Sequence, residues 1–307
     1  MALLQRQTAI RRNELLYELQ THGSADFPFQ AYLNDFSRFR NQFANWHCHS
    51  ELEFTVVVEG KFDCGINDKH YELSPGDGVF INTNVLHMTK PLTDLNHSVT
   101  FSLVFSPDFI AENPKSLIYQ KFVEPILSNG YFKGCMLSST IEWQKELIQC
   151  LQTAYEIASS EEEALELSLR NCICMAWQTF TKSQLRLLEI EAKPVCSMVY
   201  EQRAKETLSY IQEHYREAIG INDMIRAGNI SRTDCFRSFK KIIGKSPMEY
   251  LNDYRLKQAM YLLETTQESI TEIATSCGFN HLSYFGKLFR ETTGLSPKEY
   301  RAQRMKY

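Results

Sequence analysis

The stretch "ITEIATSCGFNHLSYFGKLFRETTGLSPKEYR", residues 270–301, decides the fold of the C-terminal third, because an earlier stretch repeats it. That earlier copy, "INDMIRAGNISRTDCFRSFKKIIGKSPMEY", covers residues 221–250. The copies are offset by 49 residues at the start and 50 at the end, and their matching positions are Ile221 and Ile270, Phe239 and Phe289, Gly244 and Gly294, Ser246-Pro247 and Ser296-Pro297, and Tyr250 and Tyr300. Two copies are too few for a solenoid, so they predict two similar small helical subdomains.

The second copy has the pattern of two short helices joined by a tight turn. Ile273 and Ala274 fall on one helical face, and Gly278 can adopt the positive φ that ends a helix. Phe285 and Phe289 then form the apolar face of a second helix. The pattern predicts a helix-turn-helix unit, in which the second helix keeps a free outer face.

The outer faces of the two second helices carry side chains of the kinds that contact DNA. In the first copy this helix is predicted to begin after Ser231, a common N-cap residue. Arg237 suits guanine edges and Lys240 suits phosphates. Gly286 lies on the corresponding face of the second copy and offers no side chain, so that unit is expected to contact fewer bases. The full set of predicted DNA-binding residues is Ser231, Arg232, Thr233, Phe236, Arg237, Lys240, Lys241, His281, Leu282, Ser283, Lys287 and Arg290.

The region from about Phe27 to Phe105 has the pattern of β-strands. Short apolar or alternating runs such as "FTVVVEG" and "VTFSLVF" are separated by turn signals such as "SPGDG". Strands at this spacing predict an antiparallel barrel or sandwich. From about Ile141 to Leu188 the pattern changes to two amphipathic helices, which predict either a dimer interface or plain packing on the barrel.

The stretch "WHCHSELEF", residues 46–54, brings together residue types that ligate metals. On a single β-strand, alternation places His47, His49 and Glu53 on one face, and we expect His87 to join them from a neighbouring strand.

Three interpretations of these four residues stay open. Three imidazoles and one carboxylate suit a divalent ion such as Zn, Mn, Fe or Ni. The same groups can instead line the pocket of an organic effector, or the histidines can be structural. For an effector pocket, we expect Trp46 and Tyr71 to add apolar or sugar-stacking walls.

Length and composition are those of a globular protein with more than one domain. The 307 residues are 43% hydrophobic and 23% charged, which predicts two or three domains with substantial cores. The nine cysteines show no pairing framework and no CxxC motif, so we expect reduced thiols in a cytoplasmic protein. The N-terminal segment does not match a signal peptide, and no window of ~18 uncharged apolar residues predicts a membrane span.

Charge is distributed unevenly along the chain. Residues 201–307 carry 17 Lys and Arg against 13 Asp and Glu, whereas residues 1–200 carry 16 against 24. A basic third on an acidic body indicates a polyanionic partner for that third. The sequence contains no Gly-rich phosphate loop, GxSxG or HExxH motif, so no catalytic residues are predicted.

On these motifs, about the last hundred residues resemble the AraC/XylS-type bacterial transcription regulators. The resemblance rests on residues 270–301 and on "SRTDCFRSFKKIIGKSPMEYLNDYRLKQAMYLL" from Ser231 to Leu263. Within the latter, "YLNDYRLKQAMYLL" looks like the linker helix of that family. The resemblance implies two helix-turn-helix units that enter successive major-groove segments on one face of the DNA.

The N-terminal region resembles the cupin-type sensor domains that precede such DNA-binding regions. The first cupin motif is matched fully, by His47, His49, Glu53 and Gly60. The second, "PGDGVFINTNVLH" at residues 75–87, is partial, because Asn82 and Asn84 replace the usual Pro and Gly. Asn adopts left-handed backbone geometry more readily than most residues, so the turn is still expected to form.

Together these observations predict an α+β protein. Its N-terminal part is a cupin-like antiparallel β-barrel with a helical hairpin, and its C-terminal part is an all-α domain of two helix-turn-helix units. The predicted boundaries are an effector-sensing domain at 1–135, a helical dimerisation or support segment at 136–190, a linker at 191–202 and a DNA-binding domain at 203–307.

The predicted function is that of a ligand-responsive, sequence-specific DNA-binding transcription regulator. We expect a cytoplasmic homodimer that is not an enzyme and that binds double-stranded promoter DNA and a small-molecule effector, with a sugar as a candidate and RNA polymerase as a further partner. Two alternatives stay open. The chain could be a metal-dependent cupin enzyme fused to a DNA-binding region, or a constitutive regulator whose barrel binds no ligand and only dimerises.

Overall fold

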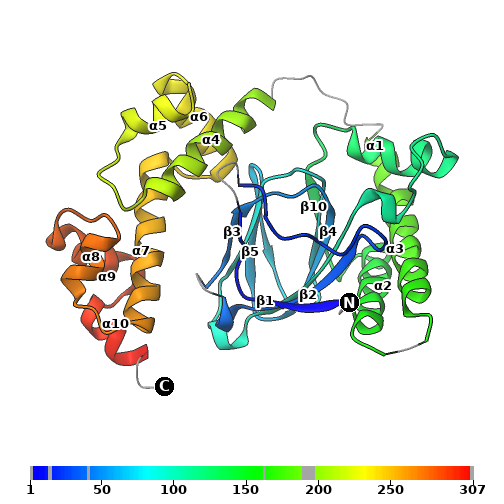
Figure 1. The fold of residues 1–307 in the computed structure, drawn as a ribbon, viewed down its shortest axis with the longest axis horizontal. Coiled ribbons are helices and arrows are strands. Elements are labelled where there is room, and N and C mark those ends of the chain that lie inside the picture. Colours follow the sequence, from blue (N-terminus) through cyan, green and yellow to red (C-terminus); the bar gives the residue numbers. More distant parts are fainter. Residues whose placement is uncertain (1–2, 13–15, 40–41, 162, 189–197, 305–307) are drawn as a thin grey trace. The chain divides into compact units, whose positions relative to one another are not determined.

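The computed structural model describes residues 3–12, 16–39, 42–161, 163–188 and 198–304 (Figure 1). The chain divides into two compact units, Met1–Met198 and Val199–Tyr307. Each unit has its own hydrophobic core. Within the described part of the chain, no helix combines the length and apolar character needed to cross a membrane.

Two β-sheets form the N-terminal unit, as the predicted barrel or sandwich requires. The larger sheet contains, in spatial order, β1 (Leu4–Gln7), β2 (Phe29–Asp35), β9 (Val99–Phe105), β4 (Leu52–Glu59), β7 (Gly78–Ile81) and β10 (Gly134–Leu137). The smaller contains β3 (Ala44–His47), β8 (His87–Pro91), β5 (Phe62–Ile66) and β6 (Lys69–Leu73). The β1–β2 pair is parallel, and the other described pairs are antiparallel. The sequence did not predict β1 or β10.

The stretch around His47 is not the single strand that we expected. β3 ends at His47 and β4 begins at Leu52, and the two strands belong to different sheets. His49 therefore lies in the connection that crosses from one sheet to the other. Alternation along one strand does not continue across such a crossing. The side chains do converge, but alternation along a single strand, which was the predicted reason, was wrong.

Two long helices, α2 (Glu142–Ala158) and α3 (Leu165–Leu188), lie side by side against the larger sheet (Figure 1). Leu151, Trp177 and Phe180 join Phe54 and Phe80 of the sheet in one buried cluster. Burying each such side chain contributes about 1.5–3 kcal/mol, so these inner faces are used for packing on the sheet. Shorter elements surround them: η1 (Phe36–Arg38), η2 (Leu95–His97), η3 (Pro107–Phe109), the π-helix η4 (Tyr119–Val123) and α1 (Glu124–Leu127).

Two of the predicted segment boundaries differ from the ends of the observed strands and helices. Residues 136–137 belong to β10 rather than to the helical segment, and residues 198–202 belong to the helix α4 (Met198–His214) rather than to a linker. The remaining linker residues at 191–197 lie outside the described residues. Eight cysteines in the described ranges are free thiols, and Cys196 falls outside them.

The C-terminal unit is entirely helical. After α4 it contains α5 (Ile221–Ala227), α6 (Arg232–Ile243), α7 (Pro247–Thr265), α8 (Ile270–Ser276), α9 (Leu282–Thr293) and α10 (Pro297–Arg304). The repeated sequence becomes two helix-turn-helix units, α5–α6 and α8–α9, which α7 joins. Each second helix ends at a left-handed glycine, Gly244 with φ 78° and Gly294 with φ 77°. The predicted repeat is therefore confirmed at the level of helices and their termini.

Candidate functional site

A cavity of about 30 Å³ lies inside the N-terminal unit, lined by residues of both sheets. Its volume has room for about one water molecule or one ion. Most of its lining groups are polar, which is unusual for the interior of a β-barrel. The lining residues are Gln7, Ile10, Glu18, His22, Tyr32, Asn34, Phe36, Phe39, Ala44, His47, His49, Glu53, Thr55, His87, Thr89, Thr100, Ser102 and Val104.

Three of the predicted site residues, His47, His49 and His87, converge on this cavity. His47 on β3 lies directly opposite His87 on β8, and their ring centroids are 4.1 Å apart. His49 approaches from the crossing connection, with its ring centroid 5.1 Å from that of His87. Each of the three rings is 5% exposed or less, and one nitrogen of each lies within 4.8 Å of the others.

The backbone determines which nitrogen of His47 and His87 faces the cavity. His47 Nδ1 lies 2.7 Å from the carbonyl oxygen of Asn45, and His87 Nδ1 lies 2.9 Å from that of Val85. A carbonyl can only accept, so both Nδ1 atoms carry the hydrogen, and the neutral rings present unprotonated Nε2 atoms to the cavity.

These unprotonated nitrogens face a carboxylate. His87 Nε2 lies 3.3 Å from Glu53 Oε2, yet it has no hydrogen-bond partner among the described residues. Lone pairs and a carboxylate facing one another are repulsive unless a cation or a proton lies between them. The same pattern, with Nδ1 fixed by a backbone carbonyl and Nε2 free, is typical of histidines that ligate metals, so the residues fit a divalent cation.

Glu53 is held in the ionised form by its neighbours. Burial raises the pKa of this carboxyl, but the hydrogen bond from His49 and the close approach of the His87 ring outweigh burial and hold the pKa well below its usual range. Its Oε2 lies 3.0 Å from His49 Nε2, and its Oε1 accepts from Thr55. Burial is the largest cause of the lowered pKa of His47, and the proximity of His87 and His49 lowers it further. The cavity therefore combines a carboxylate with a neutral imidazole, as cation binding requires.

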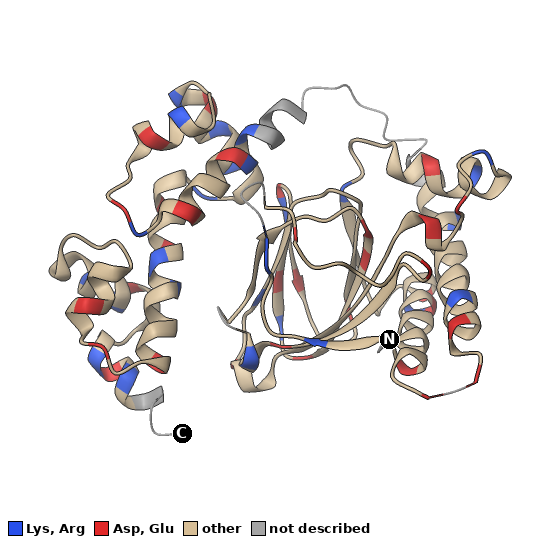
Figure 2. Cartoon of the chain, viewed as in Figure 1, with Lys and Arg blue, Asp and Glu red and all other residues tan. Residues whose placement is uncertain are grey.

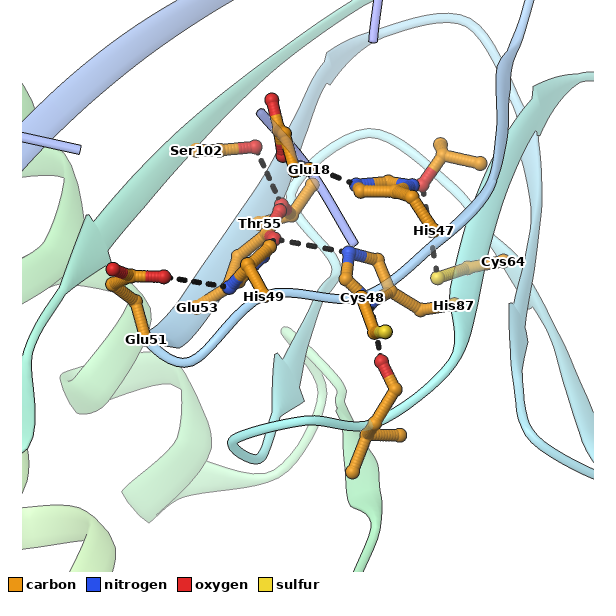
Figure 3. Close-up of polar contacts among 12 residues, drawn as sticks. Glu18, His47, Cys48, His49, Glu51, Glu53, Thr55, Cys64, His87 and Ser102 are labelled. Atoms are coloured by element: carbon orange, nitrogen blue, oxygen red, sulfur yellow. Dashed lines mark hydrogen bonds and ion pairs between the residues drawn. The ribbon is translucent and has the colours of Figure 1, made fainter. Parts of the chain in front are cut away.

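Two further polar residues reach the cavity from the N-terminal segment, and the sequence did not predict them. Glu18 Oε2 lies 3.7 Å from His47 Nε2 and 3.5 Å from His22 Nε2 (Figure 3 shows Glu18 beside His47). The segment is held against the barrel by two backbone hydrogen bonds of 2.9 Å, which join Cys48 to Leu16 and to Glu18. Nothing in the local pattern around Glu18 indicates this placement, because it depends on contacts between distant parts of the chain.

Trp46 and Tyr71, which we expected in the pocket wall, are not among the residues lining this cavity. Trp46 is adjacent to His47 on β3, so its side chain lies on the opposite face, where its ring centroid is 6.1 Å from that of His70. Tyr71 lies on β6, at the far edge of the smaller sheet from β3. Neither residue therefore forms a wall of this cavity, and their contact with an effector stays a prediction.

Most of the predicted DNA-binding residues lie on exposed sides of α6 and α9. Phe236 is half-buried, with the Arg232 guanidinium 5.8 Å from its ring centroid. Arg237 is exposed and pairs with Asp234 at 2.6 Å. Figure 2 shows Lys and Arg interspersed with Asp and Glu along these helices. The exposed members of the set are Ser231, Arg232, Thr233, Arg237, Lys240, Lys241, His281, Leu282, Ser283, Lys287 and Arg290.

A buried arginine joins α7 to the segment that follows α4, and the sequence did not identify it. Arg255 of α7 is 8% exposed and donates to the carbonyl oxygens of Tyr215 and Glu217, both at 2.7 Å. Gly278, which follows α8, packs at the same place, because a Cβ there would lie 2.3 Å from the Tyr215 carbonyl oxygen. Its φ of 84° confirms the predicted helix-ending glycine. The end of α4, α7 and the turn after α8 therefore meet at one joint.

Two family models match separate parts of the chain. One, described as an AraC-like ligand binding domain, matches residues 36–171, and the other, described as a helix-turn-helix domain, matches residues 224–303. The first contains His47, His49, Glu53 and His87, and the second contains α6 and α9. The four predicted ligand residues and the two outer helix faces thus fall within domains of matching type.

Several known proteins are similar to this chain. The "Uncharacterized HTH-type transcriptional regulator YdeC" of Bacillus subtilis (strain 168) is 26% identical over 286 residues, which are 93% of this chain and 96% of that protein. The "HTH-type transcriptional activator RhaS" of Escherichia fergusonii is 27% identical over 263 residues, 84% of this chain and 87% of that protein. The crystal structure of the DNA-binding domain of AdpA in complex with a target DNA is 32% identical, with a TM-score of 0.32, and covers 33% of this chain and 91% of that chain. With a ligand-binding domain followed by a helix-turn-helix domain, the chain belongs to the AraC-type transcription regulators.

Proposed function

We propose that this regulator acts in the cytoplasm, binds promoter DNA through α6 and α9, and senses a ligand in the cavity of its N-terminal unit. The exposed basic and polar side chains of both helices support the DNA-binding assignment, since such groups contact phosphates and base edges. The name of the relative RhaS, a transcriptional activator, supports RNA polymerase as a further partner.

The ligand that the cavity supports best is a divalent cation. The observation that carries this assignment is the convergence of two unprotonated Nε2 atoms, of His47 and His87, with Glu53 Oε2 on a cavity of about 30 Å³. These three residues would hold the ion, and the His49 Nε2–H donates to Glu53 Oε2 beside it. Zn, Mn, Fe and Ni ions all accept such ligands. A sugar is far larger than this cavity, so binding one would require the segment around Glu18 to move.

We assign the cavity to sensing rather than to catalysis. A site of this volume has no room for a substrate beside an ion, and the surrounding side chains are almost fully buried. A bound cation would supply positive charge that pairs with Glu53 and fixes the imidazoles of both sheets, so its binding would stabilise one arrangement of the barrel.

The test uses the full chain, without a polyhistidine tag, after treatment with a chelator. Genomic fragments that the protein retains at moderate salt are sequenced, and a shared site is expected. In parallel, thermal unfolding is followed with Zn²⁺, Mn²⁺, Fe²⁺, Ni²⁺ or sugars. A cation at 100 times its Kd should stabilise the fold by about 2.7 kcal/mol, and His87→Ala should abolish this gain. Retention of random duplex alone would overturn the regulator assignment, and a gain with sugars alone would overturn the cation.

We further propose that the chain forms a homodimer through the outer face of α3. Leu167 is 62% exposed and Met175 59% exposed on this face, although the inner face is buried. The double variant Leu167→Lys, Met175→Lys is expected to halve the mass measured by light scattering after size exclusion. Val58→Lys is the control, because Val58 is similarly exposed, at 52%, on β4. An unchanged mass in the double variant would place the interface elsewhere.

A further inference from the structure

A second cluster of metal-ligating residue types adjoins the cavity. His22, His49 and Glu51 each offer one ligand atom, and these atoms lie within 4.8 Å of one another. His22 and His49 are each 5% exposed, and their ring centroids are 5.1 Å apart. His49 and Glu51 come from the connection between β3 and β4, whereas His22 comes from the segment that precedes β2.

Both imidazoles of this cluster have a buried nitrogen that lacks a hydrogen bond. His22 Nε2 and His49 Nδ1 have no such partner among the residues that the structure describes. The nearest carboxylate oxygens are beyond good hydrogen-bond distance: Glu51 Oε2 lies 3.5 Å from His49 Nδ1, and Glu18 Oε2 lies 3.5 Å from His22 Nε2. A buried polar atom without a partner costs free energy, so two of them beside carboxylates indicate a missing positive partner.

The second nitrogen of each ring already has a hydrogen-bond partner. His49 Nε2 donates to Glu53 Oε2 at 3.0 Å, which leaves Nδ1 unprotonated toward Glu51 (Figure 3). His22 Nδ1 lies 2.9 Å from the hydroxyl oxygen of Tyr32, which also accepts from Gln20 at 2.9 Å. When this hydroxyl accepts from His22 Nδ1 as well as from Gln20, the neutral His22 ring presents an unprotonated Nε2 toward Glu18. A carboxylate or oxygen acceptor behind each ligating histidine is the usual outer partner of a metal site.

We propose that His22, His49 and Glu51 form a second cation site, for a divalent ion of Zn²⁺ type. Two imidazoles and one carboxylate give three ligands and leave a fourth position open. Glu18, whose side chain is 2% exposed, adds negative charge beside His22. The inference rests on the proposed sensing function of the same cavity, but its ligands differ from the pair His47 and His87.

The position of the cluster determines which parts of the chain the second ion would connect. It links the N-terminal segment, through His22, to the connection that carries His49 and Glu51. The hydrogen bond from His49 to Glu53 then joins the two sites, because Glu53 faces the first ion and orients a ligand of the second. Occupancy of either site therefore affects the geometry of the other.

The experiment counts ions in the full chain. Untagged protein is stripped with a chelator and titrated with Zn²⁺ by calorimetry, and Co²⁺ absorption in the visible range reports the ligand geometry. The wild-type chain is expected to bind two ions. His22→Ala and Glu51→Gln should each lose one ion, or weaken its binding at least tenfold, while His87→Ala loses the other. His97→Ala is the matched control, because His97 is an exposed histidine paired with Glu59 on the surface, and it should still bind two ions.

Each alternative outcome is distinct. One ion per chain, lost in His87→Ala but kept in His22→Ala and Glu51→Gln, would overturn the second site and leave the proposed function intact. Two ions in both His22→Ala and Glu51→Gln would also overturn it. No bound ion in the wild-type chain would overturn both cation assignments. Glu51 is partly exposed, so Glu51→Gln tests the site even if His22→Ala fails to fold.

Discussion

Asn84 shows how a single residue maintains the turn beside the pocket. Its φ of 59° lies in the left-handed region, which Asn adopts more readily than other residues with a Cβ. Its backbone N–H donates to the His49 carbonyl oxygen at 2.7 Å, so the turn also positions His49. Asn82 donates from its side chain to the carbonyl oxygens of Ile126 and Phe132. The prediction that the turn would form without the usual Pro and Gly is confirmed.

Gly286 is a second single residue whose position bears on function, because it lies on a helix that we propose binds DNA. A Cβ added there would meet no atom within 4 Å, so the position lies on an open face of α9. A glycine within a helix costs about 0.5–1 kcal/mol relative to alanine, and packing inside the protein does not require one here. The empty space around this position agrees with the predicted outer face of α9. Contact of that face with DNA stays a prediction.

At the residue scale, the two pairs Arg237–Asp234 and Arg226–Asp223 allow a matched comparison. Both are exposed pairs three residues apart, at 2.6 Å and 2.5 Å, but the first lies on α6 and the second on α5. Arg237→Ala is expected to weaken specific DNA binding by about 1–3 kcal/mol and to relax base preference at one position. Fluorescence anisotropy with the selected fragment and its single-base variants measures both effects. Arg226→Ala should leave them unchanged, and equal losses in the two variants would refute the assigned face.

At the element scale, capping boxes begin several helices of the C-terminal unit. Hydrogen bonds from the side chain and backbone of Ser269 lower the pKa of Glu272 at the start of α8, and Ser296 lowers that of Glu299 in the same way. The pKa of Glu249 is lowered by the backbone and side chain of Ser246. Each box forms within three residues, so these helix starts are determined locally.

The lowered pKa values predict how stability depends on pH. A carboxyl whose pKa is lower in the folded state contributes stability above its unfolded pKa of about 4.5, and loses it as pH falls through the folded value. Helical stability of the C-terminal unit is therefore expected to decline below about pH 4.5, and Glu272→Gln should reduce this decline. Urea unfolding followed by far-UV circular dichroism from pH 3 to pH 6 measures it. The exposed Glu268→Gln is the control, and equal slopes in wild type and Glu272→Gln would contradict the argument.

Also at this scale, Arg255 holds the end of α4 against α7. Arg255→Ala would leave the carbonyl groups of Tyr215 and Glu217 without this donor, and a loss of about 3 kcal/mol is expected, because hydrogen bonds to charged groups contribute about 1.5–3 kcal/mol each. Arg255→Lys should restore little of this stability, since an ammonium group cannot reproduce the planar fork of the guanidinium.

Helical circular dichroism during urea unfolding measures the loss of stability. Trp46, Trp143 and Trp177 all lie before residue 199, so unchanged tryptophan fluorescence transitions serve as the internal control. Full rescue by lysine would contradict the proposed geometry.

At the scale of the whole molecule, a sensing function requires that the cation and DNA affect each other's binding. Zn²⁺ is expected to change the affinity of the full chain for its selected promoter fragment by about 5–150-fold, which corresponds to a coupling free energy of 1–3 kcal/mol. DNA must change the Zn²⁺ affinity by the same factor. Anisotropy with chelator or Zn²⁺ measures the first effect and calorimetry with DNA the second. His87→Ala should abolish the coupling and His97→Ala should retain it, whereas equal wild-type affinity with and without Zn²⁺ would make the barrel a dimerisation module without a sensing function.

The sequence by itself determined the features of this protein that form within a few residues. The two helix-turn-helix units, the N-cap at Ser231 and the left-handed glycines are local, because a side chain or a φ angle there acts on backbone at most a few positions away. The sequence also identified the histidines and the glutamate at residues 47–53 that the structure brings to the cavity, whereas their binding of a cation or an effector stays a prediction.

Only the tertiary structure decided which side chains share the pocket. His49 reaches it from a crossing between sheets, Glu18 and His22 reach it from a segment held by hydrogen bonds to Cys48, and Trp46 and Tyr71 are excluded from it. Arg255 likewise finds its partners some 40 residues away in the chain. Such placements depend on strand register and on packing between distant segments. The local periodicity of a sequence does not encode either of them, because the same alternation is compatible with many pairings.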